Sequence, residues 1–208
     1  NSVEGIKIDY ELCKSCFLCA EECPGAALIV KGVKYTVDEF FNELIKDREY
    51  FESVDGGVTL SGGEALLQYD FSIALLKKLK EAGIHTAVDT AGLMDYARLE
   101  MAAKYTDVFL YDIKIFDATA HKKFTGADNK IILENLKKLA SDAKEIWIRT
   151  PIIPDATDSV ENIEAIAKFI ETLNADNITR WELCAFNNLC LNKYEMLNLE
   201  WEYAKYPL

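Results

Sequence analysis

The sequence of 208 residues predicts an α/β protein, a partial and incomplete parallel barrel of the eight-stranded TIM type, with a small cysteine-rich segment at the N-terminus. Three observations predict it. Strand-like apolar runs alternate with amphipathic helical stretches, polar residues follow the ends of the strand-like runs, and four cysteines lie within residues 13–23. Repeated strand–helix units predict a parallel sheet with helices outside, and five strands are too few for a closed eight-stranded barrel.

The alternation of strands and helices begins near residue 57. The expected strands are 57–60, 84–88, 108–115, 145–148 and 178–183. The expected helices are 71–82, 95–104, 130–140 and 159–173, the first with Asp70 as N-cap and Gly83 just past its end. A further amphipathic helix is expected over 37–51, where Thr36 and Glu39 form a capping box.

The sequence of the N-terminal segment predicts a separate structural unit. We expect residues 1–32 to form an iron–sulfur segment with short strands over 6–9 and 26–30, and residues 33–208 to form the partial barrel. Little apolar core is available before residue 33, so a bound ion or cluster would have to hold this segment together.

Four cysteines give this segment its chemistry. They follow the spacing of the bacterial ferredoxin run, with two, two and three residues between them and a proline after the last, at Cys13, Cys16, Cys19 and Cys23. We expect them to ligate iron–sulfur clusters of the [4Fe–4S] type, and a zinc knuckle is the alternative. Only one such run is present, so we expect little or no stable cluster in this chain and a segment that oxidises in air.

Charge and hydropathy exclude several classes of partner. The net charge is −12, from 23 Lys and Arg against 35 Asp and Glu, and no basic patch is visible. This excludes nucleic acid and anionic membrane surfaces as expected partners. No apolar run approaches the roughly 18 residues of a membrane span. Clustered cysteines without a signal-peptide pattern favour the reducing cytoplasm.

Polar residues follow each expected strand, where parallel α/β folds build their active sites. The sets are Ser61–Glu64, Asp89–Thr90, Asp112–Lys114, Arg149–Pro151 and Phe186–Asn187. Paired glycines at 62 and 63 let a ligand reach the backbone, and Glu64 can accept a hydrogen bond from a ligand amine; an ordinary turn is the alternative.

Asp112 and Lys114 are two residues apart on an expected strand, so their side chains face the same side of the sheet. The two residues are either a structural ion pair, or Lys114 is placed to form a Schiff base or to bind the carboxylate of a ligand. Structural roles are expected for His85 and His121, and Cys184 is expected to be a buried apolar residue.

Taken jointly, these motifs resemble the glycyl-radical-enzyme activating enzymes of the radical S-adenosylmethionine superfamily, those of pyruvate formate-lyase and its relatives. The resemblance covers nearly the whole chain in family order. Besides the ferredoxin run, it rests on residues 58–68, 88–92, 112–114, 121–126, 129, 132–135, 148–154 and 161–163.

The resemblance implies the following roles and assigns no catalytic residue. Gly62, Gly63 and Glu64 would hold the methionyl amine of S-adenosylmethionine, and Asp112, Ile113 and Lys114 its methionyl end, with Lys114 near the carboxylate. Asp89, Thr90 and Asp112 could ligate a monovalent cation. Arg149 would lie in the barrel interior near the cofactor. Asn187 replaces a family histidine and can still hydrogen-bond the ribose or adenine.

The resemblance also implies a reaction and its partners. The parent enzyme would cleave S-adenosylmethionine reductively at a [4Fe–4S] cluster and generate a glycyl radical on a partner enzyme of the pyruvate formate-lyase type. Its electron donor would be flavodoxin or ferredoxin. The family's Cys-x3-Cys-x2-Cys loop should precede Cys13, and no cysteine does so. We therefore expect an N-terminally truncated chain that is inactive alone.

Two other functions stay open on the residues themselves. One is an α/β-barrel lyase that uses Lys114 as a Schiff-base nucleophile. The other is a non-enzymatic, ferredoxin-like electron-transfer module joined to a binding domain.

Overall fold

The computed structural model describes residues 6, 8–197 and 199–206. The chain divides into two compact units, residues 1–36 and 37–208. The first unit carries the four clustered cysteines and the second carries the sheet, and each is described by itself.

The first unit has little regular structure. Its described residues contain one short helix, α1 (Leu18–Glu21), and no strand. The prediction of a strand over 26–30 is therefore wrong. In the strand predicted over 6–9, residues 6, 8 and 9 pair with no other strand, and residue 7 lies outside the described residues. None of the described residues here is buried, so the unit has no core to hold a strand pair together.

The second unit is built on one parallel sheet, as the sequence predicts. Its strands are β1 (Gly57–Leu60), β2 (His85–Thr90), β3 (Val108–Asp112), β4 (Glu145–Ile152) and β5 (Ile178–Ala185). They lie side by side in chain order, β1-β2-β3-β4-β5, and every neighbouring pair is parallel. The carboxyl ends of all five strands consequently meet at one edge of the sheet.

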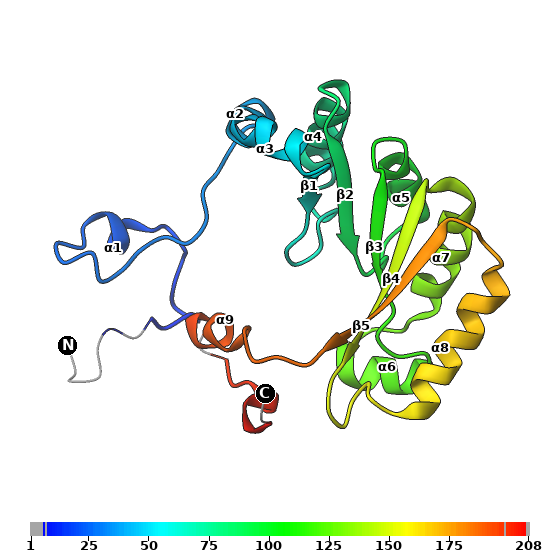
Figure 1. The fold of residues 1–208 in the computed structure, drawn as a ribbon. Helices are drawn as coiled ribbons and strands as arrows, with labels where there is room; N and C mark the ends of the chain where they lie inside the picture. Colours follow the sequence, from blue (N-terminus) through cyan, green and yellow to red (C-terminus); the bar gives the residue numbers. More distant parts are fainter. Residues whose placement is uncertain (1–5, 7, 198, 207–208) are drawn as a thin grey trace. The chain divides into compact units, whose positions relative to one another are not determined.

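The helices that the sequence predicts between the strands cover one side of the sheet (Figure 1). They are α4 (Tyr69–Glu81), α5 (Tyr96–Ala103), α7 (Lys130–Asp142) and α8 (Val160–Leu173). Asp95 and Ser159 cap α5 and α8 by accepting hydrogen bonds from the N–H groups of Ala97 and Asn162. The N-cap predicted at Asp70 is wrong: α4 begins at Tyr69 and Gln68 is its N-cap. Asp70 lies in the first turn, where its charge still favours the helix dipole.

The stretch expected as one helix over 37–51 is divided. It forms α2 (Val37–Leu44), the 3₁₀ turn η1 (Ile45–Asp47) and α3 (Arg48–Ser53). Its apolar residues, Phe40, Leu44 and Phe51 among them, pack against a small core of Val58, Leu75, Leu79 and Ile84. Besides α1 in the first unit, three described elements of the second unit were not predicted: α6 (Ala118–Thr125), α9 (Leu191–Met196) and η2 (Glu202–Lys205).

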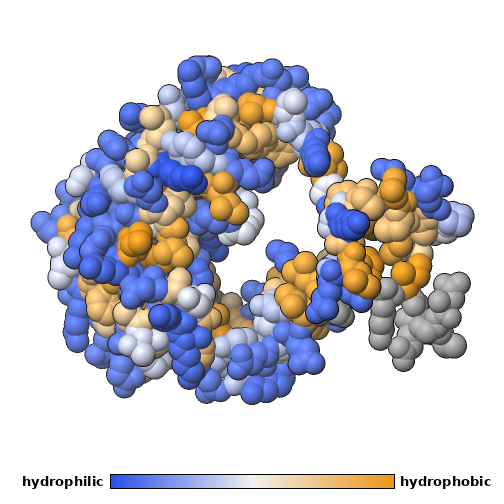
Figure 2. Space-filling view, turned by 180° about the vertical axis from the view of Figure 1, so that it is seen from behind, coloured by the Kyte–Doolittle hydropathy of each residue, from blue (hydrophilic) through white to orange (hydrophobic). Residues whose placement is uncertain are grey.

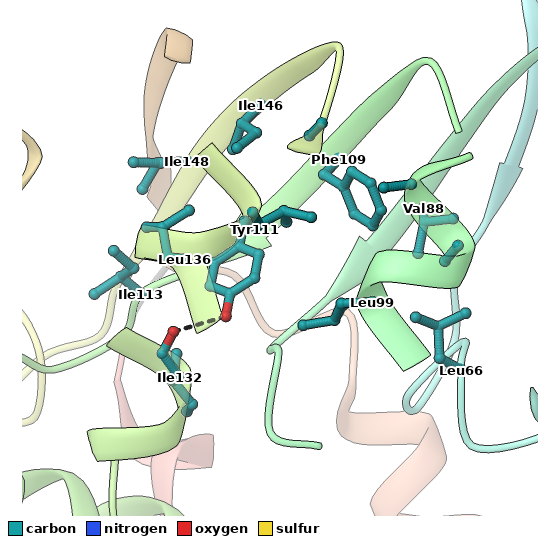
Figure 3. Close-up of a cluster of buried hydrophobic side chains, with 14 of the residues drawn as sticks. Leu66, Val88, Leu99, Phe109, Tyr111, Ile113, Ile132, Leu136, Ile146 and Ile148 are labelled. Carbon is teal, nitrogen blue, oxygen red and sulfur yellow. Dashed lines mark hydrogen bonds between the residues drawn. The ribbon is translucent and has the colours of Figure 1, made fainter. Parts of the chain in front are cut away.

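The main core lies between the sheet and the helices (Figure 3). The strands contribute Val88, Phe109, Tyr111, Ile146 and Ile148, which alternate with residues that face the other side of the sheet. Seen from behind, the sheet-and-helix part of the chain presents mostly hydrophilic residues (Figure 2). Among the described residues, no helix has the length and apolarity that crossing a membrane requires.

Candidate functional site

The side of the sheet away from the helices carries a row of charged residues. Because side chains alternate along a strand, burial of Val88, Tyr111 and Ile148 under the helices turns their neighbours to the opposite side. Those neighbours are Asp89 on β2, Asp112 on β3 and Arg149 on β4. Asp112 and Arg149 are register partners in adjacent strands. The alternation of side chains along the strands thus places Asp89, Asp112 and Arg149 on one surface, near the carboxyl ends of the strands.

Arg149 is the centre of this row. One guanidinium nitrogen, Nη1, lies 3.2 Å from Asp89 Oδ2, and Nε lies 3.7 Å from Glu182 Oε2 on β5. Burial works against the charged form, but the Cys184 thiol and the carboxylates of Asp89 and Asp112 outweigh it and raise the pKa of Arg149. Nε is buried and donates no hydrogen bond within the described residues. The Arg149 side chain as a whole is partly exposed, so the guanidinium offers its positive charge to an anionic ligand.

The turn after β1 is open to a ligand. Gly62 has a φ of 125°, in a region that residues with a side chain rarely adopt, and a Cβ at Gly62 or Gly63 would meet no atom within 4 Å. The turn borders a groove of about 430 Å³ that also runs along β1, α2 and α4. A small ligand can therefore reach the backbone N–H and C=O groups of this turn.

Glu64 is fixed from the neighbouring strand. The Thr90 hydroxyl lies 2.9 and 3.0 Å from its two carboxylate oxygens, and the N–H of Ala91 donates to Oε2 at 3.1 Å. The N–H of Leu66 donates to Oε1 at 3.3 Å. Thr90 itself is 2% exposed, so its hydroxyl holds Glu64 from beneath the site.

Asp112 and Lys114 meet as predicted, although β3 ends at Asp112. Lys114 Nζ lies 2.7 Å from Asp112 Oδ2, and both side chains are partly exposed. The Ile113 side chain is 1% exposed and lies in the core, while its N–H donates to the Arg149 carbonyl and its own carbonyl accepts from Thr150. Asp112 and Lys114 are thus the residues of this motif whose side chains reach the surface.

A second, larger cavity of about 620 Å³ lies beyond the ends of β3, β4 and β5. Lys114, Cys184 and Asn187 line it, together with aromatic residues of the C-terminal segment such as Phe186 and Trp201. Cys184 is half-buried rather than buried as expected, because it lies beside the Arg149 guanidinium on the polar side of the sheet. Asn187 therefore lies in a wall of a cavity that also contains Lys114.

The residues that the sequence predicts as metal ligands do not form a metal-binding cluster among the described residues. Across residues 6, 8–197 and 199–206, no group of three or more His, Cys, Asp or Glu side chains could hold a metal ion. Hydrogen bonding, first from the backbone of Leu28, lowers the pKa of Cys23 and favours its thiolate. Among the expected cation ligands, Asp89 pairs with Arg149 and Asp112 with Lys114. The ligand roles of these residues stay predictions.

Both histidines have the structural roles expected of them. His121 on α6 is 4% exposed, and its Nδ1 lies 2.7 Å from the carbonyl of Ala127. His85 is the exposed first residue of β2, at the opposite end of the strand from the site. Sequence reasoning missed one member of the charged row, Glu182, and it did not pair the predicted Ser61 with Asp89. The Ser61 hydroxyl donates to Asp89 at 2.9 Å, and Glu182 pairs with Arg149.

Comparison with known proteins gives one consistent family. Residues 14–170 match the model of the radical SAM superfamily. The chain is 39% identical to the isethionate sulfite-lyase activating enzyme of Oleidesulfovibrio alaskensis over 93% of its own length and 62% of that protein. It is 42% identical to the pyruvate formate-lyase-activating enzyme of Clostridium pasteurianum over 82% of its own length and 71% of that protein.

A solved structure agrees with these relatives. A domain of pyruvate-formate lyase-activating enzyme from Bacteroides vulgatus matches with a TM-score of 0.59 and 29% identity, over 69% of this chain and 93% of that one. The chain spans 62% of the length of the Oleidesulfovibrio relative, so it corresponds to a part of such an enzyme. The chain belongs to the radical SAM superfamily and, within it, to the glycyl-radical-enzyme activating enzymes.

Proposed function

We propose that this chain forms the S-adenosylmethionine-binding face of an activating enzyme that generates a glycyl radical on a partner enzyme. Members of the superfamily use a [4Fe–4S] cluster and S-adenosylmethionine. One observation carries the proposal. The Glu64 carboxylate is held by Thr90 and by the N–H of Ala91 directly after the open turn at Gly62 and Gly63.

The described residues fit the cofactor at its amine and at its carboxylate. Glu64 presents a fixed carboxylate for the methionyl amine, and the open turn leaves room for it. Lys114 and the partly exposed guanidinium of Arg149 are cationic groups suited to the methionyl carboxylate. Asn187, in the wall of the larger cavity, is suited to the ribose or adenine. When both are bound, the cofactor and the cluster supply the hydrogen-abstracting radical.

The finer expectations join the proposal. Cys13, Cys16, Cys19 and Cys23 would form the ferredoxin-like segment, residues 1–32, beside the partial barrel, residues 33–208. Flavodoxin or ferredoxin would be the electron donor, and a monovalent cation would lie near Asp89, Thr90 and Asp112. All six cysteines are free thiols, which supports a reducing compartment such as the cytoplasm. The partner would be a glycyl radical enzyme of the pyruvate formate-lyase type.

Binding of S-adenosylmethionine tests the proposal. We expect equilibrium dialysis to detect binding by the full chain, and Glu64→Gln to weaken it about tenfold, because a neutral amide loses the ionic hydrogen bond to the amine. Glu81→Gln is the matched control: Glu81 pairs with Lys77 on the exposed surface of α4 and its loss should leave the affinity unchanged. Absence of binding, or equal effects of the two substitutions, would refute the proposal.

A further inference from the structure

Asn135 is a buried polar residue on α7, in a layer that otherwise packs Leu136 and Leu139 into the core. It is 3% exposed, and its Nδ2 donates two hydrogen bonds, to the carbonyls of Gly92 and Met94, both at 2.8 Å. These bonds use both protons of the amide nitrogen. A buried amide is costly unless it is satisfied, and here it is satisfied by the backbone of a single turn, the one that follows β2.

That turn connects directly to the Glu64 carboxylate. Gly92, whose carbonyl accepts from Asn135, donates its own N–H to Thr90 Oγ1 at 2.9 Å. The same Thr90 hydroxyl bonds Glu64, and so does the N–H of Ala91, the residue between them. A continuous chain of hydrogen bonds therefore joins α7 to the carboxylate.

A second contact holds the same helix against the same turn. Tyr111 on β3 is fully buried and donates from its hydroxyl to the Ile132 carbonyl at 2.7 Å, one helical turn before Asn135 (Figure 3). The Tyr111 ring fills the space beside Gly92, where a Cβ would lie 1.8 Å from the hydroxyl oxygen. The turn is thus linked to α7 directly through Asn135 and indirectly through Tyr111.

We propose that Asn135 is a positioning residue that sets the place of the Glu64 carboxylate, and through it the affinity for the amine of S-adenosylmethionine. The inference rests on the proposed function. Removing the amide frees the carbonyls of Gly92 and Met94, the turn loses its anchor, and the Thr90 and Ala91 donors shift together with it.

The test compares two substitutions and two ligands. Asn135→Ala removes the anchor. Asn177→Ala is the matched control, because Asn177 also donates from Nδ2 to a backbone carbonyl, that of Ala143 at 2.8 Å, but at the opposite end of the strands. Dissociation constants are measured on the full chain for S-adenosylmethionine and for an analogue in which hydrogen replaces the α-amine.

We expect Asn135→Ala to weaken binding of S-adenosylmethionine about tenfold and binding of the analogue less than about twofold, since the analogue has no amine for Glu64 to hold. Asn177→Ala should change neither constant beyond about twofold. An equal loss for both ligands would overturn the proposal, because that is the result of a general structural defect.

A measurement without ligand separates this proposal from the proposed function. In a double-mutant cycle of Asn135→Ala and Glu64→Gln, followed by urea unfolding, we expect the effects on stability to be non-additive, and those of Asn177→Ala and Glu64→Gln to add. Coupling in a protein that does not bind S-adenosylmethionine would refute the proposed function and support the positioning of Glu64. Additivity of Asn135 and Glu64 would refute the positioning role.

Discussion

The hydroxyl of Tyr111 occupies the space that a side chain on Gly92 would need. An ideal Cβ at Gly92 would lie 1.8 Å from Tyr111 Oη and 2.3 and 2.7 Å from two ring carbons. Gly92 also has a φ of 68°, which favours glycine. The turn that supports Glu64 is therefore closed to any larger residue.

Gly92→Ala should accordingly lower the free energy of unfolding by about 3 kcal/mol or more, since neither the fully buried tyrosine ring nor the backbone can give way. Gly126→Ala is the control. Gly126 has a similar φ of 81° at the end of α6, but nothing lies within 4 Å of its Cβ position, so the loss should be about 1 kcal/mol. Urea unfolding of both variants measures the difference, and similar losses would contradict the steric argument.

Asp107 gives the protein a dependence on pH at the end of the sheet opposite the site. Burial raises the pKa of its carboxyl, but hydrogen bonds from Lys144, Lys80 and the N–H of Thr86 outweigh it and hold the pKa well below the ordinary value of 3.8. A lowered pKa stabilises the folded state above pH 3.8, and this stabilisation is lost as the pH falls toward the pKa of the folded state.

Asp107→Asn should therefore lower the free energy of unfolding by about 2 kcal/mol at pH 7, and the difference from the parent protein should shrink below about pH 4. Asp38→Asn removes an exposed partner of Lys78 and should have little effect at any pH. Chemical unfolding at a series of pH values tests this. A difference for Asp107→Asn that stays constant down to pH 2 would contradict it.

The cysteine segment should contribute little to the stability of the sheet, because residues 1–36 form a separate unit in which none of the described residues, 6 and 8–36, is buried. We expect Cys16→Ala to change the free energy of unfolding of the second unit by less than about 0.5 kcal/mol. Leu76→Ala, in the main core, should cost about 3 kcal/mol. Near-ultraviolet circular dichroism follows the tryptophans, all of which lie in the second unit. A large effect of Cys16→Ala would refute the independence of the sheet.

We predict that this chain by itself does not cleave S-adenosylmethionine. Its 208 residues contain no Cys-x3-Cys-x2-Cys spacing, which the family uses for the cluster that carries out the cleavage. After anaerobic reconstitution with iron, sulfide and a reductant, chromatography should detect no 5′-deoxyadenosine above the protein-free background. A complete activating enzyme treated in the same way is the positive control, and production of 5′-deoxyadenosine by this chain would contradict the prediction.

The sequence predicted all five strands, because buried parallel strands are short apolar runs between helices. It placed several carboxyl ends too early: β4 continues to Ile152 and β5 to Ala185, where the two pair with each other. That pairing depends on a neighbour about 30 residues away, which local hydropathy does not show. Helix α6 was missed because its stretch is polar and short, although Asp117 at its start and Gly126 at its end are ordinary cap residues.

The sequence predicted the charged residues of the candidate site. It did not predict the residues and contacts that hold them in place. Motifs after the strands located Glu64, Asp112 and Lys114. The alternation that turns Arg149 toward Asp89, two strands away, was not predicted from the sequence, because it depends on which face of β4 the helices cover. Asn135 belongs to one of the motifs on which the family resemblance rests. Its role could be inferred only from the fold, since its hydrogen-bond partners, Gly92 and Met94, lie more than 40 residues earlier in the sequence.

The strand order β1-β2-β3-β4-β5 has a consequence for how the protein is made. Each strand pairs only with the strand before it and the one after it, so no step of sheet assembly has to wait for a distant part of the chain. During synthesis β2 can dock on β1 as soon as α4 and β2 itself have left the ribosome, and each later strand extends a sheet that already exists. The surface that carries Asp89 and Arg149 is then completed only when β4 arrives, so the edge proposed to bind the ligand is among the last parts of the sheet to form.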